Sequence, residues 1–295
     1  MRILSIGEIL WDVIGGKEYL GGAPFNFSVH AVRLGHEVKF LSAVGKDARG
    51  DRARQEAQGF GIDIELLGET ELAPTGVSVV SNETGHGKHQ LLRPAAFDYC
   101  NLTASQTAAI AAWQPDWIYF GTLAQLTPST LALTRSLIEE NPRAQRFYDV
   151  NLRPHNFTEP VIRQLLALST IVKLNREEMP ELAAMHSLAM DIRFPGFARG
   201  LMEQYPLNCV CMTNAEEGCE VFRAHPLASI QSAGYSIQVA DTIGAGDAFA
   251  AAFLHGLNLN WPLERVCDFA NRVGALMASR AGATPVWTVA EAEGL

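Results

Sequence analysis

Near its C-terminal end the chain carries the stretch Val239-Ala240-Asp241-Thr242-Ile243-Gly244-Ala245-Gly246-Asp247-Ala248-Phe249. Apolar residues at 235–239 predict the end of a strand, and residues 245–257 predict a helix. Two glycines between them let backbone N–H groups approach a ligand, and a helix start adds unpaired N–H donors and partial positive charge. Strand, small-residue loop and helix in this order indicate an α/β protein with a phosphate-binding loop.

Asp247 falls in the first turn of this predicted helix. A carboxylate there can take a proton from an attacking hydroxyl while the amides hold a transferring phosphoryl group. The alternative is that Asp247 only stabilises the helix dipole. A dinucleotide-binding loop would need a small residue where Phe249 stands, and no Gly-x-x-x-x-Gly-Lys-Ser/Thr motif of a P-loop occurs.

The rest of the chain alternates between strand and helix patterns. The predicted strands are residues 2–7, 37–44, 117–121, 146–150, 171–174 and 208–212. The predicted helices are residues 23–34, 129–140, 160–168 and 177–185. This alternation predicts a doubly wound, mostly parallel sheet flanked by helices, with ligands at the carboxyl ends of the strands.

Two segments depart from the alternation. Residues 77–81 and 89–93 are strand-like and flank a turn signal at 83–87, which predicts a hairpin. Residues 11–20 are also strand-like. We therefore expect one domain over 1–295, with a small β-sheet from about 12–20 and 76–96 covering one edge.

Composition limits the class of protein. The 295 residues carry a net charge of −9 without a run of Lys or Arg, which argues against nucleic acid or an anionic membrane as partner. Five cysteines, an odd number with no zinc-site spacing, fit a reducing compartment, and Cys209 and Cys211 lie in an apolar run typical of buried thiols. No stretch resembles a signal peptide or a membrane span, so we expect a cytoplasmic protein.

Two further motifs lie near the N-terminus. Gly21-Gly22-Ala23-Pro24-Phe25-Asn26 leads into a helix; its glycines allow backbone to press against a polyol, and Asn26 offers a donor and an acceptor to hydroxyls. The alternative is a turn followed by a proline-started helix. Asp12 can accept hydrogen bonds from sugar hydroxyls, although a lone Asp in a turn is often structural.

Two motifs follow central strands. In Asp149-Val150-Asn151-Leu152-Arg153 the residues 149, 151 and 153 share one face of an extended chain, or else form a solvated strand end with a local ion pair. Asn175 and Glu178 can hold water bound to Mg²⁺. The same spacing is also that of a capping box that only stabilises a helix.

These motifs, in this order, resemble the ribokinase-like, or PfkB, family of carbohydrate kinases over nearly the whole chain. The resemblance implies a parallel sheet flanked by helices with a small β lid over the sugar. It implies ATP and Mg²⁺ as cofactors, Asp247 as general base and the amides of Gly244, Ala245 and Gly246 as anion hole. A monovalent cation such as K⁺ near Asp241 and Gly282, and a homodimer through the lid, are common in the family.

The resemblance and the motifs together give a set of expected ligand contacts. For the sugar, we expect Asp12, Gly21, Gly22, Asn26, Arg93, Asn151 and Arg153. For the nucleotide, we expect Asn175, Thr213, Gly218, Gly246 and Asn271. For Mg²⁺, we expect Asn175 and Glu178, through water. The family's Thr-x-Gly-x-x-Gly segment reads Thr213-Asn214-Ala215-Glu216-Glu217-Gly218 here, with Ala215 at the first glycine.

The form Gly-Gly-Ala-Pro looks most like fructokinases, so we expect D-fructose as substrate. Arg93 paired with Arg153 could instead clamp the carboxylate of 2-keto-3-deoxygluconate. A nucleoside kinase would need aromatic stacking, for which Phe97 and Tyr99 are the candidates. Two alternatives come from other classes of protein. One is a nicotinamide-dependent dehydrogenase that uses the 244–249 loop. The other is a non-catalytic sugar-binding regulator, and ATP consumption on adding sugar would exclude this regulator.

Overall fold

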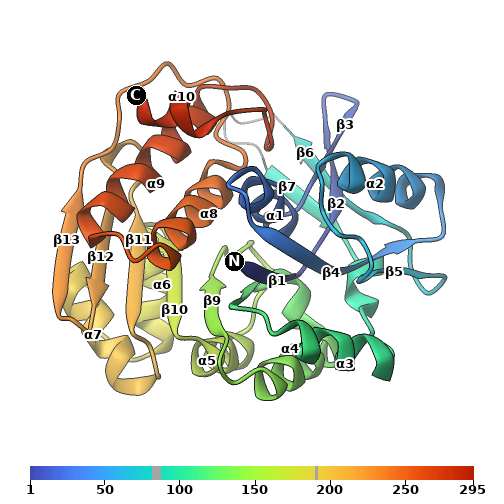
Figure 1. Cartoon of the computed structure of the whole chain (residues 1–295), viewed down its shortest axis with the longest axis horizontal. Coiled ribbons are helices and arrows are strands. Elements are labelled where there is room, and N and C mark those ends of the chain that lie inside the picture. Colours follow the sequence, from blue (N-terminus) through green and yellow to red (C-terminus); the bar gives the residue numbers. More distant parts are fainter. Residues whose placement is uncertain (82–87, 190–191) are drawn as a thin grey trace.

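The computed structural model describes residues 1–81, 88–189 and 192–295. Its centre is a nine-stranded sheet (Figure 1). Across the sheet the strands are β13 (Ala228–Ser232), β12 (Cys219–Arg223), β11 (Cys209–Thr213), β10 (Ile171–Asn175), β9 (Gln145–Asp149), β8 (Trp117–Gly121), β1 (Arg2–Ile6), β4 (Glu37–Gly45) and β5 (Leu67–Thr70). All neighbours from β11 to β5 pair in parallel, whereas β12 and β13 are antiparallel.

The central strands are apolar because both faces of the sheet are covered. In β8 all five residues are buried, and alternate side chains enter opposite cores. One core lies against α1 (Ala23–Arg33), α8 (Ala245–Asn258) and α9 (Leu263–Ala278), with α10 (Val289–Glu293) packed on the same side. Helix α2 (Ala48–Gly59) covers β4 on that face.

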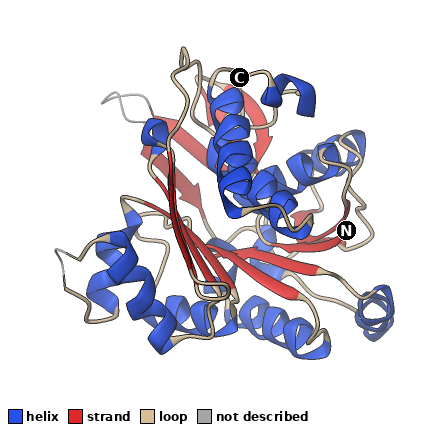
Figure 2. Ribbon diagram, turned by 60° about the vertical axis from the view of Figure 1, so that its left-hand side comes forward, coloured by secondary structure: helices blue, strands red, loops and turns tan. Residues whose placement is uncertain are grey.

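The other face carries a second layer of helices, and Figure 2 shows helices on both sides of the sheet. They are α3 (Ala104–Trp113), α4 (Pro128–Glu140), α5 (Glu159–Leu168), α6 (Glu178–Met185) and α7 (Phe194–Gln204). Short 3₁₀ helices complete the described part, at η1 (Ala96–Tyr99), η2 (Leu123–Leu126) and η3 (Ala215–Glu217). None of these helices combines the length and apolar character that a bilayer crossing needs.

A four-stranded sheet, which we call the lid sheet, lies beside β1 and β4 (Figure 1). Its order is β3 (Lys17–Gly21), β2 (Leu10–Ile14), β6 (Gly76–Ser81) and β7 (Lys88–Leu92). The chain reaches it directly from β1, so the residues 7–9 connect the two sheets. Only β2 and β6 pair in parallel; the other two pairs are antiparallel.

The predicted fold class, a mostly parallel sheet between helices with a small β-sheet at one edge, is confirmed. The predicted hairpin is β6–β7, while its turn at 83–87 lies outside the described residues. The single strand-like segment 11–20 is instead a second hairpin, because Gly15 and Gly16 take positive φ (56° and 78°) and turn the chain.

The strand predicted at 235–239 is wrong. Those residues have no regular structure, and Val239 is 60% exposed. After the edge strand β13 the chain must return across the molecule to α8, so it has no neighbouring strand with which to pair. The amides of Ala240 and Asp241 bond instead to the carbonyl oxygen of Ala278 at the end of α9.

Helix α1 joins the two ends of the chain. His30 is fully buried; Trp287 Nε1 donates to its Nδ1 (3.0 Å), which leaves Nε2–H to donate to the carbonyl oxygen of Ala283 (3.1 Å). One turn later, the guanidinium of Arg33 donates to the carbonyl oxygens of Thr284 (2.8 Å) and Pro285 (2.6 Å). We call these contacts the α1 clamp.

Candidate active site

A cleft of about 1210 Å³ lies where the carboxyl ends of the parallel strands face the lid sheet. Strand order reverses between β1 and β8, and open α/β sheets bind ligands at such a switch point. The predicted site residues that line the cleft are Asp12, Gly22, Asn26, Asn151, Arg153, Asn175, Glu178, Thr213, Gly244, Gly246 and Asp247. The structure thus brings together motifs that are more than 200 residues apart in the sequence.

The N-terminus of α8 forms one wall. Gly244 takes φ +77°, and a Cβ there would lie 2.4 Å from the carbonyl oxygen of Ala283, so glycine is required. Asp241 holds the loop, since its two carboxylate oxygens accept from the amides of Ile243 (3.0 Å) and Gly282 (3.1 Å). The amide of Ala245, predicted to face an anion, donates to the carbonyl oxygen of Thr242 (3.3 Å).

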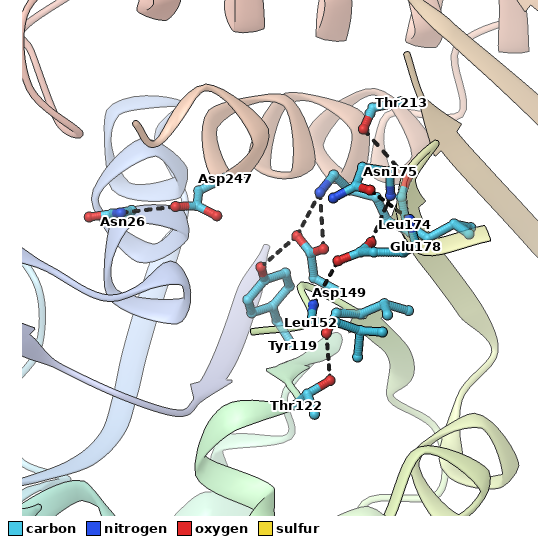
Figure 3. Close-up of polar contacts among 12 residues, drawn as sticks. Asn26, Tyr119, Thr122, Asp149, Leu152, Leu174, Asn175, Glu178, Thr213 and Asp247 are labelled. Carbon is cyan, nitrogen blue, oxygen red and sulfur yellow. Dashed lines mark hydrogen bonds and ion pairs between the residues drawn. The ribbon is translucent and has the colours of Figure 1, made fainter. Parts of the chain in front are cut away.

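Asp247 lies in the first turn of α8 and lines the cleft. Asn26 Nδ2 donates to its Oδ2 at 2.9 Å, a contact that joins α1 to α8 (Figure 3). Burial raises the pKa of Asp247 to about 6, and the carboxylate of Asp149 adds to this, while Asn26, Lys173 and Arg153 oppose it. At neutral pH the group is therefore ionised yet close enough to its pKa to exchange a proton.

Behind Asp247 lies a buried ion pair. Lys173 Nζ contacts both oxygens of Asp149 (3.0 and 2.9 Å), and Tyr119 donates its hydroxyl to Asp149 Oδ2 (3.1 Å; Figure 3). Burial disfavours the ammonium charge of Lys173, but the Asp149 carboxylate outweighs it and raises the pKa of this lysine. A Cβ on Gly246 would lie 3.7 Å from Lys173 Nζ, so this cation adjoins the positive end of α8.

Lys173 is absent from the sequence-based set of site residues. The sequence does contain an indication of its importance. A single lysine lies within the apolar strand Ile171-Val172-Lys173-Leu174, and a buried lysine needs a partner for its charge. The pattern does not tell which partner, because Asp149 is 24 residues away on the neighbouring strand.

Asn175 and Glu178 form the capping arrangement. Asn175 Oδ1 accepts from the Glu178 amide (2.9 Å), and Glu178 Oε2 accepts from the Asn175 amide (2.8 Å). Glu178 Oε1 also accepts from the Leu152 amide (2.6 Å), so this carboxylate ties the ends of β9 and β10 together. Burial raises the pKa of Glu178 to about 7, with the two backbone amides and Lys173 opposing it.

The opposite side of the cleft, toward the lid sheet, is rich in carboxyl groups. Burial raises the pKa of Asp12 to about 6, although the Ser78 hydroxyl and Arg153 lower it. Glu8 is 4% exposed, and burial raises its pKa to about 7. Gly21 and Gly22 leave room for these groups, since a Cβ would lie 2.6 Å from Asp12 Oδ2 and 2.5 Å from the Glu8 carbonyl oxygen, respectively.

Two of the predicted sugar contacts, Gly21 and Arg93, do not line the cleft. The guanidinium of Arg93 pairs with both oxygens of Asp98 and donates to the carbonyl oxygen of Leu123 (3.2 Å). The guanidinium group of Arg93 is therefore already paired within the protein, with Asp98 and Leu123.

Gly218 and Asn271 also lie away from the lining. The side-chain amide of Asn271 donates to Ser232 and to the carbonyl oxygen of Ala233 (3.1 Å), and Gly218 packs against the same segment. Ala215, at the position of the family's glycine, takes φ +48°, so the backbone is left-handed there without glycine.

The expected shared face of 149, 151 and 153 is wrong. Strand β9 ends at Asp149, and Asn151 takes φ +38°, which breaks the alternation of an extended chain. All three residues nevertheless line the cleft: Asp149 is buried and paired with Lys173, while Asn151 and Arg153 reach the cleft from the loop.

The donors present fit a nucleotide with its divalent cation. First-turn amides of α8 and the Lys173 ammonium suit phosphate oxygens, and Gly246 keeps the approach open. No group of three or more His, Cys, Asp or Glu side chains forms a metal cage in the described residues. Mg²⁺, which keeps several waters and binds phosphates, does not need one.

A second cavity, of about 720 Å³, lies at the amino ends of the strands, far along the sheet from this cleft. Its walls include Arg2, Trp117 and Asn208. None of the predicted site residues lines it.

Residues 7–289 match the family model described as pfkB family carbohydrate kinase. A fructokinase of Escherichia coli is 28% identical over 282 residues, which cover 89% of this chain and 87% of that protein.

Solved structures share the fold. A fructokinase with bound ATP from Xylella fastidiosa superposes with a TM-score of 0.84 at 23% identity, covering 99% of this chain and 97% of that one. A 2-dehydro-3-deoxygluconokinase from Thermotoga maritima gives a TM-score of 0.82 at 18% identity, covering 100% and 98%. At these identities the likeness speaks for the fold and leaves the substrate open.

Proposed function

The chain belongs to the pfkB family of carbohydrate kinases, and from that membership we propose that it phosphorylates a hydroxyl of D-fructose with ATP and Mg²⁺. One observation carries the proposal. An ionised carboxyl, Asp247, stands in the cleft at the N-terminus of α8, beside the buried ammonium of Lys173. A base and an anion-stabilising site next to each other are what transfer of a phosphoryl group to an alcohol requires.

In this proposal Asp247 accepts the proton of the attacking hydroxyl. Asn26 holds Asp247 Oδ2 and so fixes the orientation of the carboxylate. The amides of Gly244 and Gly246 and the ammonium of Lys173 stabilise the negative charge that develops on the phosphoryl oxygens. Asp149 acts through Lys173, by keeping it charged and in place.

We assign the binding of ATP to Asn175, Glu178 and Thr213, which line the cleft together with Lys173. ATP supplies the phosphoryl group, and Mg²⁺ neutralises part of its charge. Glu178 would act on the metal through water, since its two oxygens already accept backbone amides. Gly218 and Asn271 would shape the nucleotide pocket indirectly, by anchoring residues 232–234.

The charges near the lid sheet favour a neutral sugar over a sugar acid. The positive charge of Arg153 lowers the pKa of all three carboxyl groups there, those of Glu8, Asp12 and Asp247. The second arginine of a carboxylate clamp would be Arg93, which Asp98 already engages. Both features support fructose rather than 2-keto-3-deoxygluconate, the second candidate; a nucleoside is the third.

A coupled assay of ADP formation tests the proposal, with fructose, 2-keto-3-deoxygluconate, ribose and adenosine at equal ATP and Mg²⁺. We expect fructose to give the highest kcat/KM and EDTA to abolish turnover. A ranking with the keto acid first would overturn the substrate assignment. Turnover of ATP that no sugar or nucleoside stimulates would overturn the assignment of the acceptor altogether.

Three expectations of the sequence analysis remain proposals. A K⁺ site near Asp241 and Gly282 predicts faster turnover in KCl than in choline chloride of equal ionic strength. The lid sheet exposes Tyr19 (45%), Val79 (38%) and Leu92 (48%), which supports a homodimer through it, and sedimentation would show the mass. We also propose one domain with the lid sheet as its insertion, acting in the cytoplasm.

A further inference from the structure

Glu8 is a buried acid, and the fold leaves one of its two carboxylate oxygens without a partner among the described residues. It follows β1 by two residues, at the switch point of the sheet, and lines the cleft. Among the described residues its Oε2 atom is buried and has no hydrogen-bond partner. Burying an unsatisfied acceptor is costly, so such an atom calls for a partner that arrives with a ligand.

A second acceptor of the same kind lies nearby. Asn26 donates through Nδ2 to Asp247, but its Oδ1 is buried and, within the described part of the chain, also unpartnered. Glu8 and Asn26 both line the cleft, and the charge of Asp247 acts on Glu8. Unsatisfied acceptors around a general base match a ligand with several O–H donors.

The neighbouring backbone is shaped around Glu8. Gly22 takes φ +109°, and a Cβ there would lie 2.5 Å from the carbonyl oxygen of Glu8 and 3.3 Å from its Cγ. The amides of Glu8 itself and of Ala23 donate to the carboxyl group, and the positive charge of Arg153 also lowers its pKa. The second glycine of the motif therefore leaves the space that the backbone and side chain of Glu8 occupy.

We propose that Glu8 is a specificity-determining residue whose Oε2 accepts a hydrogen bond from a second hydroxyl of the sugar, close to the hydroxyl that Asp247 deprotonates. The inference rests on the proposed function and deepens it: the substrate must be a polyol with a free hydroxyl beside the reacting one. Asn26 Oδ1 accepts from the same ligand.

The test is Glu8→Gln, which keeps the shape and replaces one acceptor oxygen by an N–H₂ donor. We expect kcat/KM for the best sugar to fall about 10- to 150-fold, the range for a hydrogen bond to a charged group, with KM for ATP unchanged. Glu203→Gln, which replaces an exposed residue of α7, is the matched control. It should leave kcat/KM for the sugar and KM for ATP unchanged. Unchanged sugar kinetics in Glu8→Gln overturns the proposal.

A structural role would give a different result. Because burial raises the pKa of Glu8, its ionised form destabilises the folded state above the unfolded pKa of about 4.5. Glu8→Gln should therefore melt at the same temperature as the wild type or higher at pH 8. A lower melting temperature together with equal losses on all substrates would mean a structural residue and would contradict the inference.

Monodeoxy analogues of the best sugar, measured on the wild type and on Glu8→Gln, identify the hydroxyl. For one analogue the wild type should lose about as much kcat/KM as Glu8→Gln loses on the full sugar, and the variant should lose little more. The proposal is overturned if, for every analogue, the loss of kcat/KM caused by the missing hydroxyl and the loss caused by Glu8→Gln multiply, because the two changes would then be independent.

If no sugar is phosphorylated, the proposed function fails, and calorimetric binding of the same sugars judges Glu8 separately. Binding that Glu8→Gln weakens supports the inference. Binding that Glu8→Gln leaves unchanged, or the absence of binding, overturns it.

Discussion

As the proposed general base, Asp247 has to meet two requirements at once. It must be ionised to accept a proton, and it must be close to neutral so that the proton transfer is efficient. Burial and Asp149 push its pKa up to about 6, while Asn26, Lys173 and Arg153 keep it from rising further. The balance depends on side chains from α1, β9, the loop after β9 and β10, of which only Asp149 and Arg153 lie close together in sequence.

We expect Asp247→Asn to lower kcat by about 10²- to 10⁴-fold, the usual contribution of a general base. The fold should survive, because the change removes a charge that desolvation disfavours. Asp268→Asn on α9, outside the cleft lining, is the control. Steady-state kinetics and a melting curve of each variant are the measurements, and near-normal turnover of Asp247→Asn would remove it from the role.

The same pKa predicts the pH dependence of the wild type. Protonated Asp247 cannot accept a proton, so kcat/KM should fall as the pH drops through about 6. Glu8 and Glu178 have pKa values near 7 in the same cleft, so the fall begins above 6 and is steeper than for one group. A profile that is flat from pH 7.5 to 5 would contradict the assignment.

At the level of single residues, sequence reasoning located most of the cleft and misplaced a few side chains. Asp12, Asn26 and Asp247 are cleft residues because motif spacing and strand ends determine where they fall. Arg93 could not be placed, because its partner Asp98 belongs to a 3₁₀ turn that the pattern does not predict. Glu8 was passed over because nothing in a sequence tells that an acceptor is buried without a partner.

At the scale of the elements, the 3₁₀ helix η3 contains a residue with a strained backbone conformation. Ala215 takes φ +48°, where an L-residue with a Cβ is disfavoured and the family's motif has glycine. The neighbouring contacts hold the turn, since the amides of Glu217 and Gly218 donate to the carbonyl oxygens of Asn214 (2.9 Å) and Ala215 (3.1 Å). Alanine at this position therefore makes the loop conformation more costly than glycine would.

We expect Ala215→Gly to raise the free energy of unfolding by about 0.5–1 kcal/mol, since the relief of left-handed strain exceeds the extra entropy of glycine in the unfolded chain. Ala184→Gly, at an exposed position in α6, is a control of opposite sign and should cost about 1 kcal/mol. Urea unfolding measures both. A destabilised Ala215→Gly would mean that the side chain makes contacts worth more than the strain.

The elements themselves were predicted where their pattern was regular. Helix α1 and strand β8 appear within a residue of their expected bounds, since glycine, proline and apolar runs mark them. The false strand at 235–239 has the apolar composition of a strand, but pairing depends on a neighbour that only the tertiary arrangement supplies. The order of strands in the sheet was likewise beyond reach, because it is set by crossovers and not by local pattern.

On the scale of the whole molecule, the α1 clamp connects the N-terminal helix to residues 283–287. It requires neutral His30, because Nδ1 accepts from Trp287. Burial foremost, and Arg33 in addition, lower the pKa of His30 to about 3, although the carbonyl oxygen of Ala283 favours the proton on Nε2. Unfolded histidine titrates near 6.5, so this group makes stability fall as the pH drops below about 6.5.

We therefore expect the free energy of unfolding to drop between pH 7 and 5.5 by about 1 kcal/mol more in the wild type than in His30→Gln, which lacks the titrating group. His155→Asn, which changes an exposed histidine, should keep the pH dependence of the wild type. Urea unfolding at the two pH values gives the comparison. An identical pH dependence in His30→Gln would show that His30 does not hold a neutral ring in the folded protein.

The clamp also bears on the order in which parts of the chain can be fixed during synthesis. Asn26, which orients Asp247, lies one turn before His30 on the same helix, while the carbonyl oxygens that dock this helix belong to residues 283–285. A chain that has not yet been synthesised as far as residues 283–285 lacks the carbonyl oxygens that dock the His30 and Arg33 side chains. The helix that carries Asn26 is therefore secured by partners that follow it by more than 250 residues.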